Sequence, residues 1–280
     1  MSLRLAVAQS LVGLDQHANA AAVRDLMRQA RAAGADLAHF PEGAVSGYPS
    51  GAGKAHFKGW SVDWDGLRRE LEDIAKLAAE LELWAVVGAN HRLSGETRPH
   101  NSLYVISPQG ELAGRYDKRL ISGSELADFY TPGRDPLVFE AGGFRFGLAL
   151  CIEVNFPQLF LEYGALGADV VLFSTYSEDP IFGVLAQAYA AATNCWVSLS
   201  APAQFSRVLS SGVIGPHGYW LSQARRDGQQ ALAITDLDRS DPALDMALNK
   251  ARPWRAKART GDIYGARNLD DPRSRDQSRF

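Results

Sequence analysis

The chain of 280 residues is 46% hydrophobic, 10% aromatic and 22% charged, which is typical of a globular protein and excludes a disordered or collagen-like one. Its net charge of −3 provides no overall attraction to nucleic acid or to an anionic membrane, so we expect neither as a partner. Two cysteines are too few for a disulfide scaffold.

Neither an export segment nor a membrane span is predicted. The apolar run at residues 3–8 is too short for a signal peptide. No stretch reaches the roughly 18 apolar residues that a membrane span needs. We therefore expect a soluble, cytoplasmic protein.

Strands and helices alternate in the first half of the chain. Apolar runs predict strands, and apolar residues at helical spacing predict helices. The predictions are strands over residues 3–8, 36–40 and 84–89, with helices over 16–33 and 65–83 between them. Two further strands, 102–106 and 111–116, flank Ser107-Pro108-Gln109-Gly110, which is typical of a hairpin. A polar loop is expected over residues 117–135.

The second half repeats the alternation. The predictions are strands over residues 137–140, 144–150, 170–174 and 196–200, helices over 156–166 and 182–194, and a hairpin over 213–221. Residues 33–40 also resemble residues 166–173, because both place Gly-Ala-Asp between a helix end and a buried strand. This pattern predicts an α/β layered fold with mixed sheets and two related halves.

The C-terminal residues differ in charge from the remainder. Residues 251–280 contain eight basic and four acidic residues, whereas the whole chain is acidic. We expect one domain over residues 1–250 and an extended arm over 251–280. The arm is either solvated or packed on an acidic partner subunit through Trp254, Ile263 and Tyr264.

Three segments place a reactive side chain at the end of a predicted strand, where α/β folds commonly carry their chemistry. Glu42 follows the strand that ends at residue 40, Lys118 opens the polar loop, and Cys151 follows strand 144–150. Each has an ordinary explanation when taken singly, namely a loop carboxylate, a solvated lysine and a small buried thiol. A cysteine at a strand-to-helix turn is also a recurrent nucleophile position.

The histidines and cysteines do not predict a metal site, and two of them are expected in the core. The six histidines form no helical i, i+4 pair and only two cysteines accompany them, so a metal site is not expected. His39 lies inside a predicted strand, and Cys195 lies beside Trp196 at a helix-to-strand junction. Both are predicted to be packed core residues.

Together with neighbouring motifs, the three segments resemble the nitrilase, or carbon–nitrogen hydrolase, superfamily. The motifs arrive in the family's order over roughly residues 3–240: Phe40-Pro41-Glu42, Gly47-Tyr48-Pro49, His100-Asn101-Ser102, Tyr116-Asp117-Lys118, Cys151-Ile152-Glu153, Phe156-Pro157 and Gly167-Ala168-Asp169. The sequence departs from the family where Arg119 replaces a histidine and Gln158 replaces a glutamate. These departures leave the substrate subclass open.

The resemblance implies a catalytic triad of Glu42, Lys118 and Cys151, with Glu125 as a second glutamate that holds Lys118. Cys151 would attack an amide or nitrile carbon, and Glu42 would carry the proton. Lys118 and the N–H group of Ile152 would stabilise the developing negative charge.

The resemblance also implies an αββα sandwich, a homodimer or larger homo-oligomer, and no metal or organic cofactor. Tyr48, Ile152 and Tyr176 are the predicted substrate-binding residues. The expected reaction is hydrolysis of a non-peptide C–N bond in a small amide or N-carbamoyl compound through a thioester, releasing ammonia or an amine.

Three alternatives to this reaction remain open, namely a nitrilase, an acyltransferase using the same cysteine, and a catalytically weak interaction protein. Specificity is expected from loops 43–64, 119–135 and 176–182.

Overall fold

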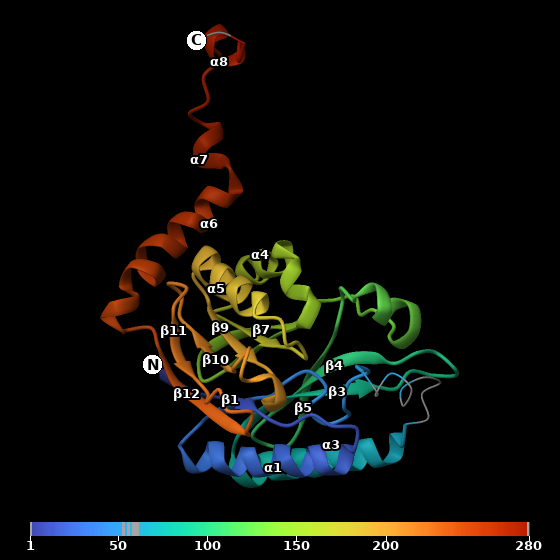
Figure 1. Cartoon of the computed structure of the whole chain (residues 1–280). Coiled ribbons are helices and arrows are strands. Elements are labelled where there is room, and N and C mark those ends of the chain that lie inside the picture. The colour runs from blue at the N-terminus through green and yellow to red at the C-terminus, as the bar shows by residue number, and fades with distance from the viewer. Residues whose placement is uncertain (1, 52–53, 55–56, 58–61, 279) are drawn as a thin grey trace.

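Two β-sheets lie face to face between two layers of helices (Figure 1). The computed structural model describes residues 2–51, 54, 57, 62–278 and 280. Helices α1 and α3 cover one sheet, and helices α4 and α5 cover the other. The predicted αββα sandwich with mixed sheets is therefore confirmed.

The first sheet has six strands in the order β12-β1-β2-β3-β4-β5. Its strands are β1 (Ser2–Gln9), β2 (Leu37–His39), β3 (Trp84–His91), β4 (His100–Ile106), β5 (Leu112–Asp117) and β12 (Ala231–Asp238). β1, β2 and β3 are parallel, and β4 and β5 form the predicted hairpin. The pairs β3–β4 and β4–β5 are both antiparallel, so β5 runs in the same direction as β2. The C-terminal ends of β2 and β5 therefore lie at the same end of the sheet's strands.

The second sheet has the order β11-β10-β9-β8-β7-β6. Its strands are β6 (Val138–Ala141), β7 (Phe144–Leu150), β8 (Val170–Ser174), β9 (Trp196–Ser200), β10 (Gly212–Ile214) and β11 (Trp220–Gln223). β7, β8 and β9 are parallel, as β1, β2 and β3 are in the first sheet. The predicted hairpin at residues 213–221 is confirmed as β10 and β11.

The helices begin and end where the sequence predicts, within a few residues. They are α1 (Gln16–Ala32), α3 (Trp64–Leu81), α4 (Pro157–Ala165) and α5 (Ile181–Thr193). The Asp15 side chain caps α1 by accepting hydrogen bonds from two backbone N–H groups, and Asp63 caps α3 in the same way with one. α4 begins at Pro157. Proline suits the first helical turn because a backbone N–H at that position would have no acceptor within the helix.

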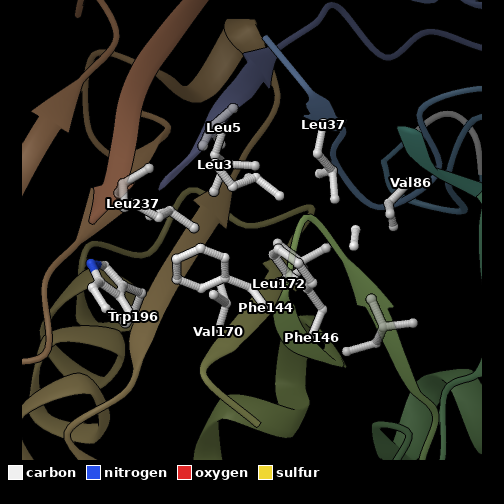
Figure 2. Close-up of a cluster of buried hydrophobic side chains, with 14 of the residues drawn as sticks. Leu3, Leu5, Leu37, Val86, Phe144, Phe146, Val170, Leu172, Trp196 and Leu237 are labelled. Atoms are coloured by element: carbon white, nitrogen blue, oxygen red, sulfur yellow. The ribbon is translucent and has the colours of Figure 1, made fainter. Parts of the chain in front are cut away.

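The largest hydrophobic core lies between the two sheets. Figure 2 shows Leu3, Leu5 and Leu37 of the first sheet facing Phe144, Phe146 and Leu172 of the second. All six side chains are at most 1% exposed. Smaller cores fill the spaces between each sheet and its helices. Burial of apolar surface on both faces explains why the parallel strands are nearly continuous apolar runs.

The two Gly-Ala-Asp segments have the same structure, as their sequence similarity predicts. Gly34 and Gly167 end their helices with φ of +79° and +77°. Asp36 then accepts a hydrogen bond from the backbone N–H of Arg4, at 2.8 Å, and Asp169 accepts the equivalent bond from Arg145, at 3.0 Å. Each half therefore joins its helix to its parallel strands by the same contacts.

His39 joins the two sheets inside the core. Its imidazole is fully buried and lies 2.7 Å from the Ser174 hydroxyl and 2.8 Å from the Ser198 hydroxyl. Because Ser174 donates its own proton to the carbonyl of Phe40, it accepts from His39 Nε2, and Ser198 donates to Nδ1. The prediction of a satisfied core histidine is confirmed.

Three features differ from the predicted elements. Strand β12 is not predicted because acidic residues are disfavoured in strands, but Asp236 lies opposite Arg4 of β1 and forms an ion pair with it at 2.7 Å. The predicted loop 117–135 contains a π-helix, Glu125–Phe129, a rare element without a simple periodicity. Beyond the π-helix Met246–Ala251, three short helices follow: α6 (Arg252–Thr260), α7 (Asp262–Gly265) and α8 (Pro272–Arg275).

Neither cysteine forms a disulfide bond, and Cys195 is a buried core residue as predicted. Among the helices of the described residues, none has both the length and the apolar character that crossing a membrane requires.

Candidate active site

A buried lysine lies between two glutamates near the C-terminal ends of β2 and β5. Lys118 Nζ donates to Glu42 Oε1 at 2.9 Å and to Glu125 Oε1 at 2.7 Å. The side chains of Lys118 and Glu42 have no solvent exposure, and that of Glu125 has 3%. A charged amine removed from water in this way needs such partners, which excludes the alternative of a solvated surface lysine.

Glu42 is also held by two further donors, one in β4 and one just after β8. Asn101 of β4 donates its side-chain amide to Glu42 Oε1 at 2.7 Å. The backbone N–H of Tyr176, just after β8, donates to Oε2 at 2.8 Å. This second bond joins the two sheets at the site. Burial raises the pKa of Glu42, and the Glu125 charge adds to this effect, whereas Lys118 and Asn101 oppose it.

Glu125 has the opposite electrostatic balance. Burial alone would raise its pKa, but the Lys118 charge and hydrogen bonds from Lys118, Ser122 and Tyr48 lower it below its ordinary value. The pKa of Lys118 is raised, because the nearby acidic groups outweigh the effect of its burial. At neutral pH the lysine is therefore charged, and the two carboxylates differ in their readiness to accept a proton.

Cys151 lies in a strained turn between β7 and the 3₁₀ helix Cys151–Asn155. Its φ is +48°, a left-handed conformation that non-glycine residues seldom adopt. Burial and the Glu42 charge raise the pKa of the Cys151 thiol to about 12, whereas the Lys118 charge and the nearby Thr175 hydroxyl act in the opposite direction. The resting thiol is therefore protonated at neutral pH and depends on a base for activation.

Comparison with known proteins identifies the family. Residues 4–243, which make up most of the chain, match the carbon–nitrogen hydrolase family. The chain belongs to the carbon–nitrogen hydrolase family.

Within this family the chain is similar to proteins named as hydrolases and amidases. A hydrolase of Mycobacterium tuberculosis is 29% identical, over 60% of this chain and 59% of its own length. The human deaminated glutathione amidase is 26% identical over 70% of this chain and 64% of its own. The NitN amidase of Nesterenkonia sp. AN1 shares the fold with a TM-score of 0.73, at 22% identity over 90% of this chain and 99% of its own.

Two of the three predicted substrate-binding residues of this family member form an aromatic wall beside the glutamates. The Tyr48 and Tyr176 rings stack with centroids 4.8 Å apart, and the Tyr48 hydroxyl donates to Glu125 Oε1 at 2.9 Å. Phe205 packs edge-on against Tyr176 at 5.1 Å. Ile152 is half-buried in the 3₁₀ helix next to Cys151. Of the loop 43–64, residues 52–53, 55–56 and 58–61 lie outside the described part of the chain.

Two residues that contact the predicted triad, Asn101 and Thr175, carry no sequence signal of that role. Asn101 belongs to a quoted motif but receives no role from the sequence, since an asparagine in a strand carries no signal of its partner. Thr175 has no motif at all. It stands beside Cys151 because Leu150 and Ser174 are paired in the parallel register of β7 and β8. Its buried hydroxyl has no nitrogen or oxygen partner among the described residues.

Proposed function

We propose that this protein is a cysteine-dependent amidase that hydrolyses the C–N bond of a small amide or N-carbamoyl compound. The observation that carries the proposal is the buried Glu42–Lys118–Glu125 cluster beside a thiol in a strained turn. A nucleophile, a base and a fixed positive charge are the groups that acyl transfer to a thiol requires. Two tyrosines beside the cluster offer an apolar wall for a small substrate.

In the proposed first step, the Cys151 sulfur attacks the amide carbon and Glu42 takes the thiol proton. Glu42 suits this role because its raised pKa makes it the better proton acceptor of the two carboxylates. Lys118 and the N–H group of Ile152 stabilise the negative oxygen of the tetrahedral intermediate. Glu125 stays ionised and holds the ammonium group of Lys118 in place.

In the proposed second stage, Glu42 returns the proton to the leaving nitrogen, the C–N bond breaks, and ammonia or an amine departs. A thioester then joins the acyl group to Cys151. Glu42 next takes a proton from water, the hydroxide attacks the thioester carbon, and the carboxylic acid is released with restoration of the thiol.

The named relatives support amide chemistry. The human relative is a deaminated glutathione amidase. In structures of the Nesterenkonia amidase, acrylamide has added to the active-site cysteine, and the acetamide moiety of fluoroacetamide is attached covalently there. These ligands favour an amide over a nitrile as the substrate of the present chain.

The proposal is tested by measuring ammonia release from a panel of small amides, N-carbamoyl amines and nitriles. We expect the wild type to release ammonia from amide-type compounds and Cys151→Ala to release none. Cys195→Ala is the matched control, since that thiol is buried in the core and should leave the rate unchanged. Equal rates in the wild type and Cys151→Ala would refute the nucleophile assignment.

We further propose that two copies of the chain associate through helices α4 and α5. Apolar side chains on these helices are exposed in the single chain, including Leu161 at 41%, Ile181 at 44% and Val184 at 57%. Helices α4 and α5 contact each other, so several large exposed apolar side chains on this pair of helices support an interface there. The homodimer would bury this surface.

A further inference from the structure

Glu153, two residues after the predicted nucleophile, is a fully buried carboxylate that the proposed reaction does not use. A buried carboxylate is costly unless its oxygens accept hydrogen bonds. The partners of Glu153 lie on two separate segments of the chain, and each segment carries one member of the predicted triad.

On the lysine side, Glu153 Oε1 accepts hydrogen bonds from the backbone N–H groups of the two residues after Lys118. The distances are 2.8 Å to Arg119 N and 3.1 Å to Leu120 N. The Tyr116 hydroxyl, two residues before Lys118, lies 2.8 Å from Oε1 and 2.9 Å from Oε2. The carboxylate thus holds the chain on both sides of the lysine.

On the cysteine side, Glu153 Oε2 accepts the backbone N–H of Leu150 at 2.7 Å. This bond closes the turn that contains Cys151 in its left-handed conformation. A non-glycine residue keeps such a conformation only when surrounding contacts outweigh its strain. The Glu153–Leu150 bond is one such contact.

We propose that Glu153 is a positioning residue that ties the Lys118 segment to the Cys151 turn and so sets the distance and orientation between thiol and ammonium group. The inference rests on the proposed function for its kinetic consequences, but its structural content does not depend on the substrate. Misplacement of reacting groups by about 1 Å is enough to lower a rate by roughly a hundredfold.

The role requires both oxygens of the side chain. Every hydrogen-bonding partner named above donates to Glu153, and the donors are divided between Oε1 and Oε2. A glutamine has nearly the same size but replaces one oxygen by an NH₂ group, which cannot accept a backbone N–H. Glu153→Gln therefore releases one of the two segments whichever way its amide is oriented.

The experiment compares the wild type with Glu153→Gln and with Glu162→Gln as a matched control. Glu162 lies on the neighbouring helix α4, is 40% exposed, and accepts from the Arg119 guanidinium at 2.7 Å. Two quantities are measured well below the melting temperature of each variant. One is the kcat and KM for ammonia release, and the other is the pH dependence of Cys151 alkylation by iodoacetamide, followed by mass spectrometry.

We expect Glu153→Gln to lower kcat at least about tenfold with little change in KM. Its alkylation profile should move to higher pH, because a displaced Lys118 stabilises the thiolate less. Glu162→Gln should match the wild type in both measurements. A merely structural role would lower the melting temperature without moving the alkylation profile of the folded protein.

Wild-type kcat and an unchanged alkylation profile in folded Glu153→Gln would overturn the proposal. Should that variant fail to fold, Glu153→Asp replaces it, because its carboxylate is one methylene too short to reach both segments. An unshifted profile in folded Glu153→Asp would equally overturn the proposal. A shifted profile in a protein whose wild type releases no ammonia would refute the proposed function and leave the positioning role supported.

Discussion

The two carboxylates that hold Lys118 differ in what surrounds them, and this difference assigns their roles. Glu125 is contacted by donors on both oxygens, as Glu42 is, and the Lys118 charge together with these donors lowers its pKa. Glu42 shares the same lysine, but its complete burial dominates and raises its pKa. A neutral thiol, a charged lysine and one carboxylate ready to accept a proton are the resting state that thiol activation by a base requires.

Substitution of Asn101 tests this assignment through the pH dependence of the rate. The Asn101 amide donates to Glu42 and favours the ionised carboxylate. In Asn101→Ala that stabilisation is lost, so the pKa of Glu42 should rise further. We expect the acidic limb of the kcat/KM profile to move to higher pH than in the wild type. An unchanged limb would show that Glu42 is not the base.

At the scale of single elements, His39 makes the junction between the sheets sensitive to acid. Burial lowers its pKa to about 3 from the ordinary 6.5, so the folded protein holds the imidazole neutral. Between these pH values the unfolded chain binds a proton that the folded chain does not. The contribution of His39 to the free energy of unfolding is therefore fully present above pH 6.5 and is lost as the pH falls toward 3.

We expect the free energy of unfolding to fall in this range by up to about 1.4 kcal/mol per pH unit from His39. Urea unfolding at a series of pH values measures the slope. His39→Gln carries no titrating group at this position and should show a shallower slope below pH 6.5. Equal slopes in the two proteins would mean that other groups account for the acid sensitivity.

The repeated Gly-Ala-Asp unit makes a second prediction at the element scale. A methyl group at Gly34 or Gly167 would approach the guanidinium of Arg4 or Arg145, at 3.5 and 3.4 Å, and both glycines have positive φ. Each Gly→Ala change should destabilise the fold by ~1 kcal/mol, mainly through backbone strain.

The control for these two variants is Gly164→Ala. Gly164 lies in α4, and a methyl group there meets no atom within 4 Å. Since alanine favours helix, this variant should be more stable by roughly 0.5–1 kcal/mol. Chemical denaturation measures the free energy of unfolding of the three variants. A clearly unequal loss of this free energy in Gly34→Ala and Gly167→Ala would contradict the structural equivalence of the two halves.

At the scale of the whole molecule, the C-terminal residues run away from the sandwich (Figure 1). Arg252 anchors the start of α6 to Asp169 by an ion pair at 2.9 Å. Farther along, Trp254, Ile263 and Tyr264 are 57%, 37% and 50% exposed. We propose that residues 251–280 form an arm beyond the domain 1–250, and that these apolar side chains pack on the second subunit of the dimer.

The proposed dimer is tested with one charged substitution on each side of the sandwich. The wild type should have twice the chain mass of 30.4 kDa by light scattering. Val184→Glu on α5 should dissociate the dimer, because it buries an unpaired charge in the interface. Leu112→Glu on β5 has the same 57% starting exposure and should leave the dimer intact. A monomeric wild type would refute this interface.

The sequence predicted the strand and helix order well because each element carries a local periodicity. Strand 170–174 and the β4–β5 hairpin are confirmed at nearly the expected residues. β12 and the π-helix at Glu125 were missed, since the first depends on a distant partner strand and the second lacks a repeating pattern. Glu42, Lys118 and Glu125 were predicted to lie together, and the structure places them within hydrogen-bonding distance.

By itself the sequence determined where the strands end, because Glu42, Lys118 and Cys151 each lie just beyond a predicted strand. Only the tertiary structure decided what each side chain contacts. The bond from Tyr176 N to Glu42 joins residues 134 positions apart on different sheets. The two oxygens of Glu153 accept hydrogen bonds from the Lys118 segment and from the Cys151 turn, and this likewise depends on how the two segments pack. Local patterns encode the face that an element buries, whereas the pairing of buried polar groups follows from how those faces meet.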